Sequence, residues 1–131
     1  MVATAQQIST HRALVVEDNE HVCYMLEFIL KRAGYDVNAV NNGRDAQAAI
    51  ENLEPVDVIV LDLMLERGSA FAVADYANYR RPGAKVVYVT RNRFFSDGSL
   101  FRHSPNTAAI LQEDAPPSDL ANIVAYHGRA S

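Results

Sequence analysis

The sequence predicts an α/β domain with a doubly wound parallel sheet and helices on both faces. Five short apolar segments alternate along the chain with segments whose apolar residues recur at helical spacing, a pattern typical of this fold class. The most apolar segment, residues 56–65, is rich in β-branched residues and nearly continuous, as expected of a strand buried on both faces. With 131 residues, 49% of them hydrophobic and 21% charged, the chain suits a single domain with one core.

The expected strands cover residues 13–18, 35–40, 56–65, 85–90 and 107–112. Residues 35–40 alternate between apolar and polar side chains, which indicates an edge strand with one wetter face. Residues 1–10 are small and polar, so we expect a flexible tail before a single domain over residues 11–128. Residues 91–105 are irregular and carry large apolar side chains at positions 94, 95, 100 and 101, more than a short helix needs. We expect some of these side chains to join the core and part of them to form an exposed partner surface.

Four helical segments lie between and after these strands. Asn19 is a good N-cap for the first, and Gly34 is a typical residue just beyond a helix end. The apolar stripe of this helix follows the i, i+3, i+4, i+7 pattern and comprises Val22, Met25, Leu26 and Ile29. The second and third helices carry similar stripes over residues 46–53 and 70–77, and Ser118 is expected to cap the last helix.

Composition excludes several classes of function. The net charge of -4 argues against direct binding of nucleic acid, which requires a basic surface. The apolar runs are too short to cross a membrane, and the N-terminus lacks the apolar core of a signal peptide. A single cysteine allows no internal disulfide and no cysteine metal cluster, which fits a reducing compartment. We therefore expect a cytoplasmic protein that does not act on a membrane.

Three of the expected strands end in polar side chains. Glu17 and Asp18 end the first, Asp62 ends the third and Thr90 ends the fourth. In doubly wound sheets the ligand site lies at the carboxyl ends of the strands, and the flavodoxin-like order 2-1-3-4-5 puts it between the first and third strands. We therefore expect the three carboxylates to converge, with Thr90 beside them. Taken singly, each acid could instead favour a helix N-terminus or cap a turn, and Thr90 could be only a good strand former.

Converging carboxylates repel one another, so the arrangement requires a cation. Oxygen ligands without His or Cys favour a hard ion, of which Mg²⁺ is the leading candidate. A carboxylate such as Asp62 can also attack phosphorus and form an aspartyl phosphate, while a metal neutralises charge on the phosphoryl oxygens. Thr90 would then donate its hydroxyl to a phosphoryl oxygen.

In these residues the chain resembles the response-regulator receiver domains of two-component signalling, over residues 12 to about 127. Glu17 and Asp18 resemble the family's acidic pair, and Asp62 resembles its phosphoacceptor aspartate. Thr90 resembles the family's Ser/Thr after the fourth strand. The resemblance implies that Mg²⁺ binds one of the paired acids, Asp62 and the backbone carbonyl of Met64.

The same resemblance implies a biological role. The chain would be a single-domain response regulator in a phosphorelay, accepting a phosphoryl group on Asp62 from a histidine kinase or a histidine phosphotransfer protein. Because the chain leaves no room for a second domain, we expect it to signal by binding a downstream protein target. We expect no enzyme activity beyond self-phosphorylation and dephosphorylation. The sequence leaves open whether the chain forms a homodimer.

Four positions depart from the family pattern. Glu113 stands where receiver domains carry a lysine that pairs with the phosphoryl group, and Glu66 replaces a proline four residues after the phosphoacceptor. Arg91 replaces a small residue after Thr90, and Ile110 replaces the aromatic residue that usually reports the switch. Arg91, or alternatively Arg67, could supply the missing cation, because arginine binds phosphate well.

These departures motivate a second hypothesis, a pseudo-receiver that binds its partner without phosphorylation because Glu113 replaces the phosphate-pairing lysine. A third hypothesis is a nucleotide or flavin binder with the same fold. Against the third, no glycine-rich phosphate loop follows the first strand.

Overall fold

The computed structural model describes residues 11–52, 55–90 and 106–128. Its five parallel strands form one sheet in the order β2-β1-β3-β4-β5. The strands are β1 (His11–Val16), β2 (Tyr35–Val40), β3 (Val58–Asp62), β4 (Lys85–Thr90) and β5 (Thr107–Gln112). The helices are α2 (Glu20–Arg32), α3 (Gly43–Asn52), α4 (Ala70–Arg80) and α6 (Pro117–Gly128). The predicted fold class and strand order are confirmed.

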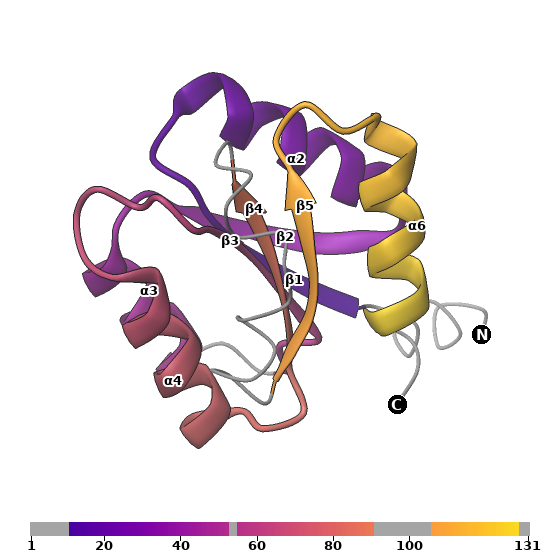
Figure 1. Ribbon diagram of the computed structural model, residues 1–131. Helices are drawn as coiled ribbons and strands as arrows, with labels where there is room; N and C mark the ends of the chain where they lie inside the picture. The colour runs from indigo at the N-terminus through magenta and orange to yellow at the C-terminus, as the bar shows by residue number, and fades with distance from the viewer. Residues whose placement is uncertain (1–10, 53–54, 91–105, 129–131) are drawn as a thin grey trace, which may run out of the picture.

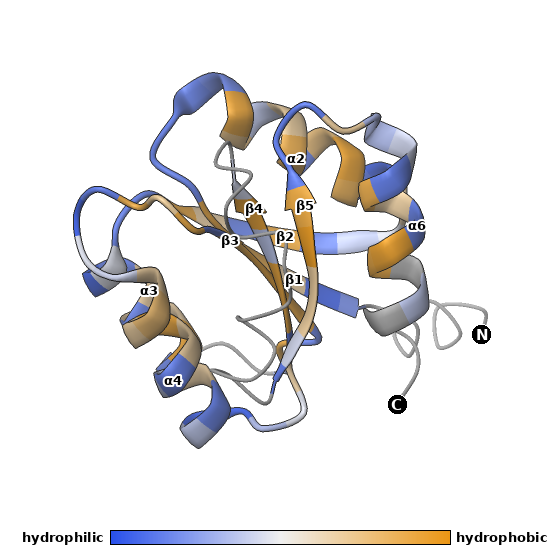
Figure 2. Ribbon diagram, viewed as in Figure 1, coloured by the Kyte–Doolittle hydropathy of each residue, from blue (hydrophilic) through white to orange (hydrophobic). Residues whose placement is uncertain are grey.

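The helices cover the two faces of the sheet in pairs. Figure 1 shows α2 and α6 on one face and α3 and α4 on the other. Each pair encloses its own apolar core against the strands. All five residues of β3 are buried, as predicted for a central strand, and the central strands are the most apolar part of the ribbon in Figure 2. The strand β2 lies at an edge of the sheet, as predicted; only Tyr35 in it is buried, and the predicted alternation breaks at Ala39, which is exposed like Asn38 before it.

The first helix begins and ends where the sequence predicts. The Asn19 side chain accepts a hydrogen bond from the Val22 amide at 3.0 Å, and Gly34 has a φ of 98° just beyond the helix end. The buried face of α2 is rotated from the predicted stripe, because Leu30 joins Leu26 and Ile29 in the core. Met25 is 37% exposed, so its prediction as a core residue is wrong.

Other boundaries shift by a few residues. The strand β1 ends at Val16, so the acidic pair lies in the loop beyond it. The strand β3 begins two residues after the start of the apolar segment 56–65 and ends at Asp62, the predicted strand end. The last helix begins at Pro117 and is not capped by Ser118; proline suits the first helical position because it lacks the N–H that would have no partner there.

Several predictions fall outside the described residues. These are the tail at 1–10, the irregular segment 91–105 with its four large apolar side chains, and Arg91. Within the described parts of the chain, every helix is too short or too polar to cross a membrane.

Candidate functional site

The sheet brings three carboxylates together at the carboxyl ends of β1 and β3. These two strands are neighbours, and Val16 pairs with Leu61, so Glu17 follows β1 directly beside Asp62 at the end of β3. Glu17, Asp18 and Asp62 each offer a carboxylate oxygen, and these oxygens lie within 4.8 Å of one another. The predicted convergence is therefore confirmed by the geometry.

Glu17 is the most deeply buried of the three acids. Its side chain is 2% exposed; one carboxylate oxygen accepts the Asn19 amide at 3.1 Å, while Oε1 is buried without a hydrogen-bond partner. Burial raises the pKa of Glu17 from 4.5 to about 8; the Asn19 amide opposes the shift, and the charges of Asp62 and Asp18 add to it. A buried carboxylate oxygen without a donor is costly, which indicates that a cation belongs beside it.

Asp62 is 5% exposed, and its Oδ1 accepts the Met64 amide at 2.9 Å. Burial raises the pKa of Asp62 above its ordinary value of 3.8, the Met64 amide acts in the opposite direction, and the charge of Asp18 adds to the increase. The Met64 side chain is 44% exposed, so its main chain rather than its side chain supports the site. The site thus holds Asp62 with one oxygen bonded to the following turn.

A backbone bond ties the acidic pair to the loop after β3. The Glu66 amide donates to Asp18 Oδ2 at 2.9 Å, while the Glu66 side chain is exposed. The sequence predicted Glu66 only as an additional acid near the site. Its main-chain role could not be seen in the side-chain pattern.

Two glycines set how closely the neighbouring loops approach. Gly68 has a φ of 107°, and a Cβ there would lie 2.8 Å from the Gly43 Cα. The Gly43 amide also donates to the Arg67 carbonyl at 2.8 Å. The sequence analysis did not predict this contact. The presence of glycine at both positions 43 and 68 was the feature of the sequence that could have indicated it.

Thr90 and Glu113 lie next to each other at the same edge of the sheet. Thr90 ends β4 and is 1% exposed, and its carbonyl accepts the Glu113 amide at 2.8 Å. Because Asp62 pairs with Val89 in the neighbouring strand, both residues stand beside the acidic cluster as predicted. Glu113 therefore brings a carboxylate to the edge where the family carries a lysine.

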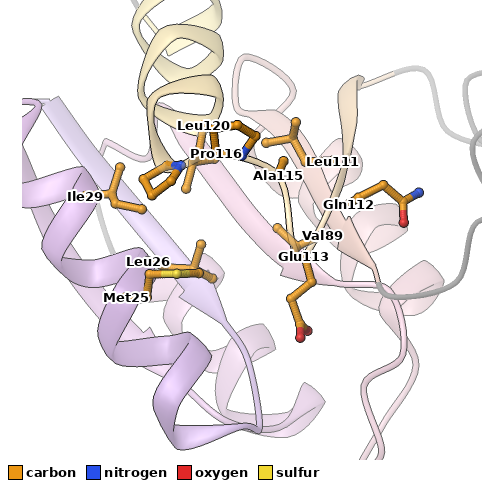
Figure 3. Close-up of a pocket in the computed structure, with 11 residues that line it drawn as sticks. Met25, Leu26, Ile29, Val89, Leu111, Gln112, Glu113, Ala115, Pro116 and Leu120 are labelled. Carbon is orange, nitrogen blue, oxygen red and sulfur yellow. The ribbon is translucent and has the colours of Figure 1, made fainter.

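A small cavity of about 20 Å³ adjoins Glu113 between α2 and the segment leading into α6. Figure 3 shows apolar side chains from α2 and α6 gathered at this cavity, with the Glu113 carboxylate extending away from them. The space is enough for about one water molecule, so it offers no ligand site. Ala115 also lines the cavity.

Two further predicted positions behave differently from the family pattern. Ile110 in β5 is half-buried and packs against the core on the α3 and α4 face. Arg67 lines a hollow of about 380 Å³ with Asn42 and Arg44, and Asp62 is not among the described residues that line it.

The acidic cluster suits a hard divalent cation. All three side chains offer oxygen, the ligand atom that Mg²⁺ prefers, and these oxygens lie within 4.8 Å of one another. A hollow of about 380 Å³, lined by Glu17, Asp18, Glu20 and Asp45 among others, leads from solvent to the cluster. Oε1 of Glu17, which has no hydrogen-bond partner, would be available to such a cation as a ligand with no competing donor.

Comparisons with known proteins agree with this geometry. A family model described as the response regulator receiver domain matches residues 13–97. The alkaline phosphatase synthesis transcriptional regulatory protein PhoP of Bacillus subtilis is 41% identical over 56 residues, which span 43% of this chain but only 23% of that protein.

Solved structures share the fold over nearly the whole chain. A CheY-like receiver domain from Methanospirillum hungatei superposes with a TM-score of 0.82 at 24% identity, covering 93% of this chain and 96% of its own. The receiver domain of a sensor histidine kinase from Pseudomonas aeruginosa, solved with magnesium in its active-site cleft, gives 0.78 at 20% identity, covering 92% and 98%. With the family model matching most of its length, this chain belongs to the response-regulator receiver domain family of two-component signalling.

Proposed function

We propose that this chain is a working phosphoacceptor that takes a phosphoryl group onto Asp62 in a Mg²⁺-dependent reaction and signals in the cytoplasm by binding another protein. The observation that carries the proposal is the convergence of Glu17, Asp18 and Asp62 within 4.8 Å. The magnesium in the active-site cleft of the Pseudomonas aeruginosa relative supports the choice of ion.

The chemistry follows from the positions of the groups. A carboxylate oxygen of Asp62 attacks phosphorus, a new O–P bond forms an acyl phosphate, and the bond from phosphorus to the donor breaks with its electron pair leaving on the donor. Glu17, Asp18, Asp62 and the Met64 carbonyl are the groups that would hold Mg²⁺, and the bound ion would supply positive charge for the phosphoryl oxygens. Thr90 at the end of β4 donates its hydroxyl to one of those oxygens.

The donor is a phosphohistidine of a histidine kinase or phosphotransfer protein, as in the family generally. The imidazole then leaves as the P–N bond breaks, and the chain itself performs at most its own phosphorylation and dephosphorylation. The output is a changed affinity for a downstream protein target.

The test is incubation of the purified chain with acetyl phosphate, with and without Mg²⁺, read by intact mass. We expect an increase of one phosphoryl group that requires Mg²⁺ and disappears in Asp62→Asn. The matched control is Asp75→Asn, which removes an exposed acid of α4 and should leave the adduct unchanged. An adduct that persists in Asp62→Asn would contradict the proposal.

The second candidate is a pseudo-receiver, favoured by the position of Glu113 beside Thr90. At about 6 Å and an effective dielectric of about 20, reversing one charge beside a phosphoryl group changes the interaction by up to about 5 kcal/mol. Even a fifth of that is about a fivefold change in the phosphorylated population. If the wild-type chain forms no adduct and Glu113→Lys does, the pseudo-receiver function is correct.

A further inference from the structure

One exposed line of α2 carries an acid, two aromatic rings and a base at four-residue spacing. Glu20, Tyr24, Phe28 and Arg32 form this line, which we call the α2 ridge, because side chains four positions apart are neighbours on a helix surface. The Arg32 guanidinium carbon lies 5.7 Å from the centre of the Phe28 ring, so the end of the ridge is closely packed. Tyr24 is 75% exposed and Phe28 63% exposed.

The ridge is not needed for the core. The residues of α2 that pack against the sheet are Leu26, Ile29 and Leu30, on the other side of the helix. Large aromatic rings left adjacent on a surface indicate an interaction site rather than a packing requirement. We therefore expect the α2 ridge to bind a partner.

The order of charges along the ridge identifies that partner. From its N-terminal end the ridge reads acid, ring, ring, base, and a second copy running antiparallel reads base, ring, ring, acid. A two-fold axis between Tyr24 and Phe28 then places Glu20 of each copy opposite Arg32 of the other. The same axis places each Tyr24 opposite Phe28 of the other copy, whereas a parallel arrangement would bring like charges together.

A hollow beside the ridge fits the same arrangement. It has a volume of about 270 Å³ and lies between the second half of α2 and the start of α6, lined by Phe28, Arg32, Pro117 and Ala121 among others. Figure 1 shows α2 and α6 on the same face of the sheet, with the start of α6 turned toward α2. Side chains on a helix lean toward its N-terminus, so in an antiparallel pair Tyr24 of the second copy leans toward this hollow.

We propose that two copies of this chain form a symmetric dimer through antiparallel α2 ridges, with Tyr24 of each copy filling the hollow between α2 and α6 of the other. This goes beyond the proposed function, because the dimer involves no phosphoryl group and leaves Asp62 outside the contact. The partner surface is the same α2 ridge on the second copy, so the interface has aromatic rings at its centre and one acid–base pair at each end.

The first measurement is sedimentation velocity of the full chain from about 1 μM to about 1 mM, a range that includes weak dimers. We expect a concentration-dependent dimer. Tyr24→Ser should weaken it at least about tenfold, because aromatic anchors dominate small interfaces. The matched control is Tyr79→Ser, which removes an equally exposed ring from α4 and should not change the dimer. Circular dichroism checks that each variant stays folded.

Charge exchange tests the antiparallel geometry directly. Glu20→Arg and Arg32→Glu should each abolish most of the homodimer, because each places like charges opposite one another at both ends. Mixing the two single variants should restore association, since every opposed pair is then acid and base, and the double exchange in one chain should restore it too. A wild-type chain that stays monomeric overturns the proposal. The α2 ridge would then bind a helix of another protein. A dimer whose affinity is unchanged by Tyr24→Ser or by the charge exchanges overturns the proposal as well.

Discussion

Replacing Glu17 with glutamine should have opposite effects on stability and on metal binding. The Glu17 carboxylate is buried beside two other acids, with the Asn19 amide as the hydrogen-bond donor that the structure gives it. Because its pKa rises from 4.5 to about 8, the folded chain holds a proton there that the unfolded chain has lost between those values. Metal-free stability therefore falls as pH rises across this window, by up to about 5 kcal/mol. Asp62, whose pKa is also raised, adds to the same trend.

The assay is urea unfolding followed by circular dichroism between pH 5 and about 9, in EDTA and in Mg²⁺. Glu17→Gln should remove most of the pH slope in EDTA and make the chain more stable than wild type at the upper end of the range. It should also weaken Mg²⁺ binding, because one of three carboxylates is lost. The control is Glu51→Gln, which makes the same chemical change at an exposed position of α3. An unchanged pH slope in Glu17→Gln would refute the reasoning.

Three structural predictions follow from other contacts. Gly68→Ala should destabilise the chain by about 2 kcal/mol or more, because φ is 107° and the new Cβ would meet Gly43. The control is Gly83→Ala, where the space around the new Cβ is open and stability should change by no more than about 0.5 kcal/mol. Tyr35→Phe should cost about 1 kcal/mol, since its hydroxyl donates to a main-chain carbonyl of α6 at 2.8 Å. Asn19→Ala should cost about 1 kcal/mol through loss of the α2 cap. Urea unfolding in EDTA measures all three, and a Gly68→Ala variant as stable as wild type would show that the two loops can separate freely.

Much of the fold could be predicted because local signals and the global pattern agree. The apolar run at β3, the cap at Asn19 and the positive φ at Gly34 each depend on a few neighbouring residues. The start of α6 was predicted two residues too late, because Pro117 and Ser118 are both good start signals and only tertiary position decides between them. The exposure of Met25 also required the tertiary structure, since it depends on how α2 is rotated on the sheet.

The site was predictable in its members but not in its energetics. Strand ends in a parallel sheet meet at one edge, so Glu17, Asp18 and Asp62 could be placed together from the sequence. The sequence carries no sign that Glu17 is the most buried of them, or that its Oε1 has no donor. The Glu66 amide bond to Asp18 was equally hidden, because backbone donors do not depend on residue type.

The location of the phosphoryl group tests the central claim most directly. After reaction with acetyl phosphate and Mg²⁺, borohydride reduces an acyl phosphate to homoserine, which peptide mass mapping can locate. The account predicts conversion at Asp62 alone, at a yield that falls sharply without Mg²⁺. Conversion at Glu17, Asp18 or elsewhere, or none at any Mg²⁺ concentration, would contradict it.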